Sequence, residues 1–196
     1  MADGPAAPLT PEDYLDLDRE SAAKHEYRDG KLVPVTGLSF AHTLIQFNLI
    51  ANLKPQLPRT GCRGFGGAMR VKSGSKPIYS YPDLAIVCGE PALGTDRADT
   101  LLNPILLIEI LSPATEQYDR GEKFAHYRQI PTLEEYVLVA QDTPLIEHYV
   151  RQEDDTWRWS AVAGLDETIT LPTIGCTLLL ADVYDQFDFS VAAEMK

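Results

Sequence analysis

The chain has 196 residues, of which 44% are hydrophobic and 23% charged, an ordinary composition for one folded domain. No run approaches the roughly 18 apolar residues of a membrane-spanning helix, and Met1–Leu9 lacks the features of a secretory signal. We therefore expect a cytoplasmic protein with no membrane partner. The three cysteines, Cys62, Cys88 and Cys176, contain no CxxC pair, so small buried side chains are expected rather than a zinc site or a disulfide framework.

The formal net charge of -12 by itself disfavours a nucleic-acid partner, but the charge is unevenly distributed. Between Gly30 and Pro82 there is no Asp or Glu. The Lys and Arg residues of that segment give it a charge of +7, which leaves -19 for the rest of the chain. A locally positive segment can steer a polyanion. The alternative is a chance segregation of charge.

Three elements are predicted in the N-terminal part of the chain. Thr10–Asp13 reads Thr-Pro-Glu-Asp, a typical helix start, and predicts a helix to about Asp18. Asp29-Gly30 predicts the turn of a hairpin within His25–Thr36. Apolar residues at helical spacing predict a further helix within Ser39–Leu57.

The remaining chain predicts mainly strands. Cys62–Lys72 predicts one strand that its glycines can bulge. Its glycine-rich part, Gly61–Gly67, fits a bulged strand or a loop and lacks the GxxxxGK[ST] pattern of a nucleotide-binding loop. The later predicted elements are strands at Leu84–Cys88, Pro104–Leu111 and Glu135–Ala140, a hairpin of Leu145–Arg151 and Thr156–Val162, and helices at Tyr118–Ile130 and Leu180–Phe187. Residues 1–9 are expected to be disordered. Residues 10–190 are expected to form a single α/β domain, in which helices flank a mixed β-sheet with an added β-hairpin.

Two carboxylates interrupt apolar strands. Asp83 opens the run LAIV directly after Pro82, and Glu109 lies inside ILLIEIL. A buried carboxylate is costly unless a partner compensates its charge. If the two strands are neighbours, both acids can bind one hard divalent cation together with the carbonyl of Ile110. The alternative for each acid is a buried salt bridge or hydrogen bonds to backbone amides.

Lys123 is predicted to face the sheet from the following helix. Asp119 and Glu122 fit a capping box at the start of that helix, and Lys123 shares a helix face with Tyr127. A desolvated ammonium there can orient a water molecule or stabilise charge on a phosphate. The alternative is a lysine that extends to solvent and pairs with an acid such as Glu134.

These residues occur in strings that resemble a known family. YPDLAIV and LLIEILSPATEQYDRGEKFAHYRQIPTLEEYVLV resemble the Uma-type family of restriction-endonuclease-like proteins, which belongs to the PD-(D/E)XK nuclease superfamily. HEYRDGKLV, AHTLIQFNL and LPTIGCTLLLADVYD are similar to the same family, so the likeness covers about Thr10 to Phe187. It implies a restriction-endonuclease-like core with Asp83 and Glu109 as the motif acids. The superfamily's lysine two residues after the second acid is replaced by Leu111, and Lys123 is the matching position in this family.

The resemblance also implies roles for two residues in the N-terminal strings. Glu26 is expected to add a further catalytic carboxylate. His42 matches the family's helix-start histidine, whose role is a phosphate contact or a hydrogen bond at the helix end. Apart from the resemblance, the positive charge of the acid-free segment leads us to expect that Arg70 and Lys72 contact the DNA backbone.

The expected activity is the hydrolysis of DNA phosphodiester bonds with Mg²⁺ or Mn²⁺. A homodimer is expected because cutting both strands of a duplex favours two-fold symmetry. Two alternatives remain open. One is a catalytically silent DNA- or protein-binding module, and the other is a subunit of a defence or mobile-element system that needs a partner.

Overall fold

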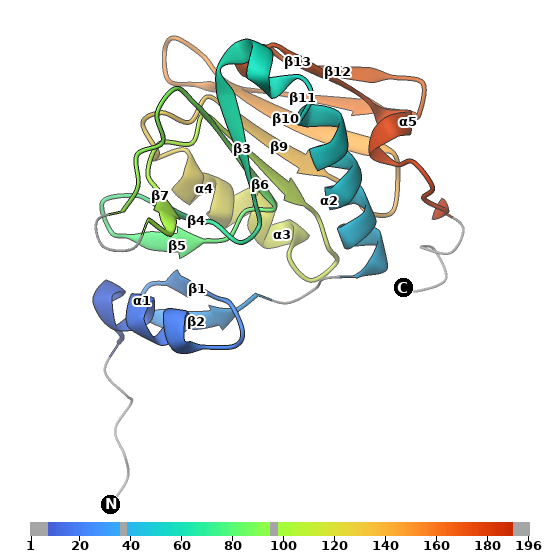
Figure 1. Ribbon diagram of the computed structural model, residues 1–196. Coiled ribbons are helices and arrows are strands. Elements are labelled where there is room, and N and C mark those ends of the chain that lie inside the picture. Colours follow the sequence, from blue (N-terminus) through green and yellow to red (C-terminus); the bar gives the residue numbers. More distant parts are fainter. Residues whose placement is uncertain (1–7, 36–38, 95–97, 190–196) are drawn as a thin grey trace, which may run out of the picture.

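A six-stranded mixed β-sheet is the largest layer of the computed structural model, which describes residues 8–35, 39–94 and 98–189 (Figure 1). Its strand order is β11-β10-β9-β8-β6-β3, with β8 and β9 parallel and the other neighbours antiparallel. The strands are β3 (Cys62–Gly66), β6 (Leu84–Cys88), β8 (Leu106–Ile110), β9 (Glu135–Val139), β10 (Leu145–Arg151) and β11 (Trp157–Ala163). The parallel pair is buried along its whole length, as expected for strands that are covered on both faces.

Helices cover both faces of this sheet (Figure 1). On one face lie α2 (Phe40–Leu53), α5 (Leu180–Val183) and the hairpin β12 (Thr168–Leu171)–β13 (Cys176–Leu179), with the short turns η1 (Leu57–Thr60) and η3 (Pro172–Ile174). On the other face lies a helical segment made of α3 (Glu116–Tyr118), the π-helical turn η2 (Asp119–Lys123) and α4 (Phe124–Tyr127). Alternate residues of β8 point to the two faces: Ile108 joins the α2 cluster and Leu107 the α4 cluster.

A second, five-stranded sheet carries the N-terminal elements, with strand order β2-β1-β5-β4-β7. Its strands are β1 (His25–Arg28), β2 (Lys31–Pro34), β4 (Arg70–Ser73), β5 (Ile78–Ser80) and β7 (Thr100–Leu101). The helix α1 (Pro11–Glu20) packs on this sheet through a cluster of three tyrosines, Tyr14, Tyr27 and Tyr79. α1, β1 and β2 together are called the N-terminal layer below.

Most predicted elements are present. Thr10 caps α1, with its hydroxyl accepting from the amide of Asp13 and the Asp13 side chain accepting from the amide of Thr10. The β1–β2 hairpin turns at Asp29-Gly30, where both residues have positive φ. Residues 1–7 and Thr36 lie outside the described residues. Leu9, expected to be disordered, is hydrogen-bonded: its amide donates to Gly30 and its carbonyl accepts from a tyrosine hydroxyl.

The prediction of one bulged strand over Cys62–Lys72 is wrong. The chain turns after Gly66, where the amide of Met69 donates to the Gly66 carbonyl at 3.1 Å. β3 therefore ends the six-stranded sheet, whereas β4 belongs to the five-stranded sheet. A glycine-rich run fits a turn between two strands as well as a bulge within one, so its composition alone does not separate the two.

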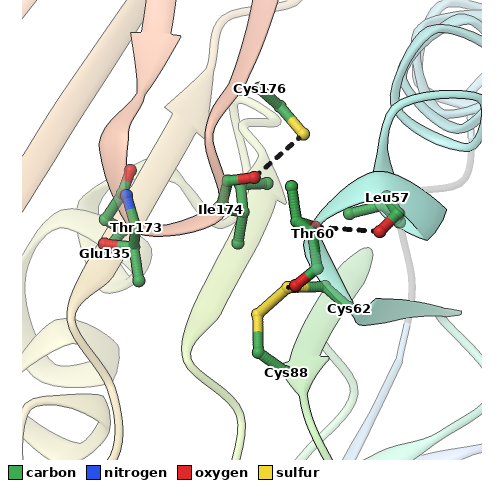
Figure 2. Close-up of a disulfide and its surroundings, with 8 residues drawn as sticks. All are labelled: Leu57, Thr60, Cys62, Cys88, Glu135, Thr173, Ile174 and Cys176. Atoms are coloured by element: carbon green, nitrogen blue, oxygen red, sulfur yellow. Dashed lines mark hydrogen bonds between the residues drawn. A yellow bond between two sulfur atoms is a disulfide. The ribbon is translucent and has the colours of Figure 1, made fainter.

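The cysteines also depart from expectation, because Cys62 and Cys88 form a disulfide (Figure 2). The β3–β6 register sets the two residues directly opposite each other, with 3.9 Å between their Cα atoms. Their separation of 26 residues leaves no local sequence signal. Cys176 is a free, buried thiol, as predicted.

None of the helices within the described ranges is long and apolar enough to cross a membrane.

Candidate active site

Asp83 and Glu109 lie on neighbouring strands. The β6–β8 register pairs Leu84 with Ile108, and Asp83 and Glu109 are the next residues of the chain outward from that pair. Glu109 lies on the same face of β8 as Leu107, the face that α4 covers. One carboxylate oxygen of Asp83 accepts from the amide of Ile110 at 2.7 Å. The structure thus brings together the two acids singled out from the sequence.

Lys123 enters this site from the helical segment that covers the same face. Its Nζ lies 2.8 Å from Oε1 of Glu109 and 3.4 Å from carboxylate oxygens of Glu26 and Asp119. The lysine side chain is 7% exposed, so it does not extend to solvent toward Glu134. The predicted capping role of Asp119 is wrong, because this residue lies inside the helical run, is 2% exposed and faces Lys123.

The position of the lysine follows from the local backbone. Asp119–Lys123 forms a π-helical turn, a rare conformation that occurs frequently at functional sites. The hydroxyl of Tyr136, from β9, donates to the carbonyl of Asp119 at 3.0 Å and holds this turn against the sheet. Leu111, at the position of the superfamily lysine, is buried in the apolar cluster on this face. The ammonium therefore comes from the helix and not from the strand.

Carboxylates outnumber cations in this site. Burial raises the pKa of Glu109 well above its ordinary value, and the charges of Asp119 and Asp83 raise it further against the opposing effect of Lys123. Burial lowers the pKa of Lys123, but Glu109, Glu26 and Asp119 outweigh it and raise that pKa well above its ordinary value. The ammonium is thus held in its charged form. An additional cation at this site would stabilise the charged form of the Glu109 carboxylate.

Glu26 reaches the site from the N-terminal layer. It is 5% exposed and accepts from the amide of Tyr81 at 3.3 Å and from the Arg28 guanidinium, whose Nε is 3.1 Å away. Burial raises the pKa of Glu26, but the positive charges of Lys123 and Arg28 outweigh burial, so this pKa is lowered. The predicted further carboxylate therefore lies against Lys123.

The oxygen donors suit a hard divalent cation. The N–H and C=O groups of a strand residue lie on one edge, so the carbonyl of Ile110, like its amide, lies on the Asp83 side. Two carboxylates and a carbonyl are the ligand types that Mg²⁺ prefers, and Mg²⁺ usually keeps several water ligands. Among the residues that the structure describes, no three His, Cys, Asp or Glu side chains form a ready metal site. The backbone and water would complete the coordination.

His42 holds Asp83 in place. It lies in the first turn of α2, and its Nε2 is 2.7 Å from the second carboxylate oxygen of Asp83. Its Nδ1 lies 3.5 Å from the amide nitrogen of Gln141, whose oxygen accepts from the hydroxyl of Ser39 at 2.7 Å. At 7% exposure, His42 is placed to orient the carboxylate rather than to meet solvent.

The structure gives Arg70 a different place from the one expected. Arg70 is 3% exposed, donates to Asp18 at 2.8 Å and pairs with Asp99, so its charge is neutralised inside the protein and is not available to DNA. Lys72 is exposed, but its partner across β4–β5 is Tyr79. Tyr79 faces α1 and not the carboxylates around Lys123. The structure therefore supports neither residue as a contact beside the site.

Two contacts of the site were not anticipated from the sequence. The hydroxyl of Tyr127 donates to Oε1 of Glu109 at 2.8 Å, and Arg28 pairs with Glu26. The helical spacing of Tyr127 and Lys123, which puts both on one face, is a sequence signal that Tyr127 can also reach Glu109. The spacing of Glu26 and Arg28, two residues apart in a strand, is a signal that they share a face.

Taken together, the fold and this site define a restriction-endonuclease-like α/β protein. Residues 11–181 match the sequence profile of the Uma2 family, described as "Putative restriction endonuclease", and the chain belongs to this family. Two uncharacterized proteins of Synechocystis sp. (strain ATCC 27184 / PCC 6803 / Kazusa) are each 31% identical. The first, sll1609, aligns over 80% of this chain and 88% of its own length, and the second, slr1290, over 94% and 97%.

A solved structure shares the fold. It is the crystal structure of a "putative nuclease belonging to DUF820" from Anabaena variabilis ATCC 29413, with a TM-score of 0.74 and 21% sequence identity. The superposition covers 93% of this chain and 98% of the other. The arrangement of mixed sheet and flanking helices predicted from the sequence is thereby confirmed.

Proposed function

We propose that this protein is an endonuclease that hydrolyses DNA phosphodiester bonds with the help of Mg²⁺ or Mn²⁺. The observation that carries the proposal is the convergence of Asp83, Glu109 and Lys123, which come from three separate elements. Membership of a family described as restriction endonucleases supports it.

The residues of the chain would divide the work as follows. Asp83, Glu109 and the carbonyl of Ile110 would hold the cation, which when bound lowers the pKa of a water ligand and stabilises charge on the phosphate. Lys123 keeps its ammonium charged, so it can donate a hydrogen bond to the attacking water or to a phosphate oxygen. His42 fixes the orientation of the Asp83 carboxylate.

A plasmid-nicking assay with Mg²⁺ or Mn²⁺ tests this function. We expect the wild-type protein to nick the plasmid and Asp83→Ala to be inactive, because the substitution removes a metal ligand. Glu153→Ala is the matched control, since Glu153 is an exposed acid in the β10–β11 turn. Equal rates for wild type and Asp83→Ala, or no activity in the wild type with either metal, would reject the proposal.

One observation favours a second candidate, a catalytically silent binding module. Both carboxylate oxygens of Asp83 already have partners, the Ile110 amide and His42, without any cation. In that case Asp83 would be a structural carboxylate. Titration calorimetry with Mn²⁺ separates the two candidates, because only a nuclease requires metal binding that disappears in Asp83→Ala.

A cytoplasmic homodimer belongs to the same proposal. Cleavage of both strands of a duplex favours two active sites related by two-fold symmetry. Sedimentation of the protein with a short duplex measures this directly. We expect two chains per duplex, and one chain per duplex at saturation would contradict the dimer while leaving the nuclease assignment intact.

A further inference from the structure

The strand β1 directs charged side chains toward the acidic residues Asp83, Glu109, Glu26 and Asp119, called the cluster below. Tyr27 faces α1 within the tyrosine cluster, so its neighbours along the strand face the opposite side. Glu26 confirms that direction by its contact with the catalytic lysine, and Arg28 bonds to Glu26. Lys24 precedes the strand, but its carbonyl accepts from the amide of Val35 at 2.9 Å, so the extended pairing continues through it.

Lys24 lies on the Asp83 side of the cluster. Its Nζ donates to the carbonyl of Gly67 at 2.9 Å and lies 5.4 Å from the centre of the Tyr81 ring. Gly67 passes so close to Asp83 that a Cβ on this glycine would be 3.8 Å from the Asp83 Cα atom. Lys24 is exposed, so its ammonium can meet a ligand from solvent.

Arg28 lies on the opposite side of the cluster, toward Lys123. Its guanidinium stacks on Tyr118 at 3.5 Å from the ring centre, and Tyr118 directly precedes the π-helical turn that carries Lys123. Nε and one terminal nitrogen are held by Glu26. The other terminal nitrogen has no hydrogen-bond partner within the described ranges, and the side chain is 26% exposed.

The charge of the site requires such cations. Glu109, Glu26 and Asp119 contact a single ammonium, that of Lys123, and Asp83 lies beside them next to Ile110, so a phosphate chain that approaches meets repulsion. The cavity of about 430 Å³ beyond Gln141 offers no relief, because its lining includes three carboxylates, Glu116, Asp142 and Asp188, and one arginine. Lys24 is exposed and Arg28 is partly exposed, and both contact residues of the cluster or their immediate neighbours.

On the basis of the nuclease function proposed above, we propose that Lys24 and Arg28 bind the phosphates that flank the scissile phosphodiester, one on each side of the catalytic residues. The planar guanidinium of Arg28, already oriented by Tyr118 and Glu26, suits a directional phosphate contact. Lys24 supplies a point charge on the Asp83 side. The two cations thus set the direction in which a strand crosses the site.

The salt dependence of DNA binding tests this arrangement without requiring cleavage. Binding of a labelled duplex is measured by fluorescence anisotropy in Ca²⁺ at several salt concentrations, for wild type, Lys24→Met and Arg28→Met. Each phosphate contact contributes about 0.9 to the slope of log K against log salt. We expect each variant to lose about that amount, and the double variant about twice as much. Arg158→Met, which removes an exposed cation from β11, should keep the wild-type slope.

A kinetic readout separates substrate binding from a structural effect. In the nicking assay Lys24→Met should raise KM with little change in kcat, because a flanking contact is made equally in the ground and transition states. Arg28→Lys should restore part of the salt slope, since it keeps the charge without the stacked fork. Wild-type slopes in Lys24→Met and Arg28→Met, or no binding of DNA by the wild type, would overturn the inference. If both variants show the expected loss of salt slope but the wild type does not cleave DNA, only the nuclease activity is rejected.

Discussion

At the scale of single residues, carboxylates outnumber the ammonium of Lys123, so removing the cation and removing one acid should have different effects on stability. Removing the ammonium leaves Glu109, Glu26 and Asp119 buried without their shared cation. We expect Lys123→Met to lower the free energy of unfolding by about 3–5 kcal/mol in the absence of metal, the usual cost of breaking a buried ion pair on one side. Urea denaturation measures this loss, and Lys54→Met, at an exposed lysine, should change stability by under about 0.5 kcal/mol.

The opposite substitution should behave differently. A pKa raised well above its ordinary value means that the charged form of Glu109 is disfavoured in the folded protein. Glu109→Gln removes that charge and leaves Lys123 with two acidic partners, so we expect its metal-free stability to equal or exceed that of the wild type, while nicking activity is lost. Mg²⁺ should raise the unfolding midpoint of the wild type but not of Glu109→Gln. A large loss of stability in Glu109→Gln would contradict this account of the charges.

The same residues show how far sequence reasoning reaches into the site. Asp83, Glu109 and Lys123 stand out because each is a charged residue in an apolar pattern, and such a pattern is visible in the sequence. Arg70 has no such pattern, and its burial depends on Asp18 and Asp99, residues distant in the chain. An acid-free stretch of sequence therefore does not predict which of its cations remain exposed.

At the scale of elements, apolar runs with clear ends gave reliable strand predictions. β6 has the predicted bounds, and β8 and β9 differ from the predicted bounds by one or two residues. Short strands with weak apolar character, such as β5 and β7, were not predicted, because their burial depends on neighbours that come from elsewhere in the chain. The turn between β3 and β4 was missed for a different reason, because a glycine-rich run fits a turn as well as a bulge.

The strand β3 is an edge strand whose attachment to β6 is covalent as well as hydrogen-bonded. The disulfide closes a loop with a sequence separation of 26, for which loop-closure entropy predicts a contribution of about 2–4 kcal/mol. We expect a reducing agent to lower the unfolding free energy of the wild type by that amount in urea denaturation. Without reducing agent, the Cys62→Ala/Cys88→Ala variant should already have the lower unfolding free energy.

The free thiol supplies the control for this measurement. Cys176 is buried on β13 and takes no part in the disulfide. The Cys62→Ala/Cys88→Ala variant, which keeps Cys176, should be insensitive to reducing agent. Equal unfolding curves of the wild type with and without reducing agent would show that β3 does not depend on the bond.

At the scale of the whole molecule, the candidate site depends on the docking of the N-terminal layer. This layer supplies Glu26 to the lysine, and a charged network joins α1 to β4 and to the residues before β7. In that network Arg70 bonds to Asp18 on α1 and pairs with Asp99, while Arg19 on α1 donates to Asp99 at 2.9 Å. Ion pairs between residues distant in the chain thus hold the N-terminal layer, which carries Glu26, against the rest of the protein.

This network predicts an acid-sensitive part of the stability. Burial raises the pKa of Asp99, but the hydrogen bond from Arg19 and the charge of Arg70 outweigh it, so the folded pKa lies below the ordinary 3.8. A lowered folded pKa stabilises the fold above the unfolded pKa, and this contribution is lost as the pH falls through the folded pKa. Asp99→Asn should therefore be less stable than wild type at neutral pH, by at most about 1 kcal/mol for a partly exposed pair.

The pH dependence of that difference is the decisive measurement. The gap in unfolding free energy between wild type and Asp99→Asn should be constant from neutral pH down to about pH 4 and should close below it, because the wild-type carboxylate then becomes protonated. In an Arg19→Met background the gap should be smaller throughout, since the Arg19 hydrogen bond is the largest effect that lowers the pKa of Asp99. A gap that persists in acid would mean that the difference between the two proteins does not come from the charge of Asp99, and it would contradict the electrostatic account of this network.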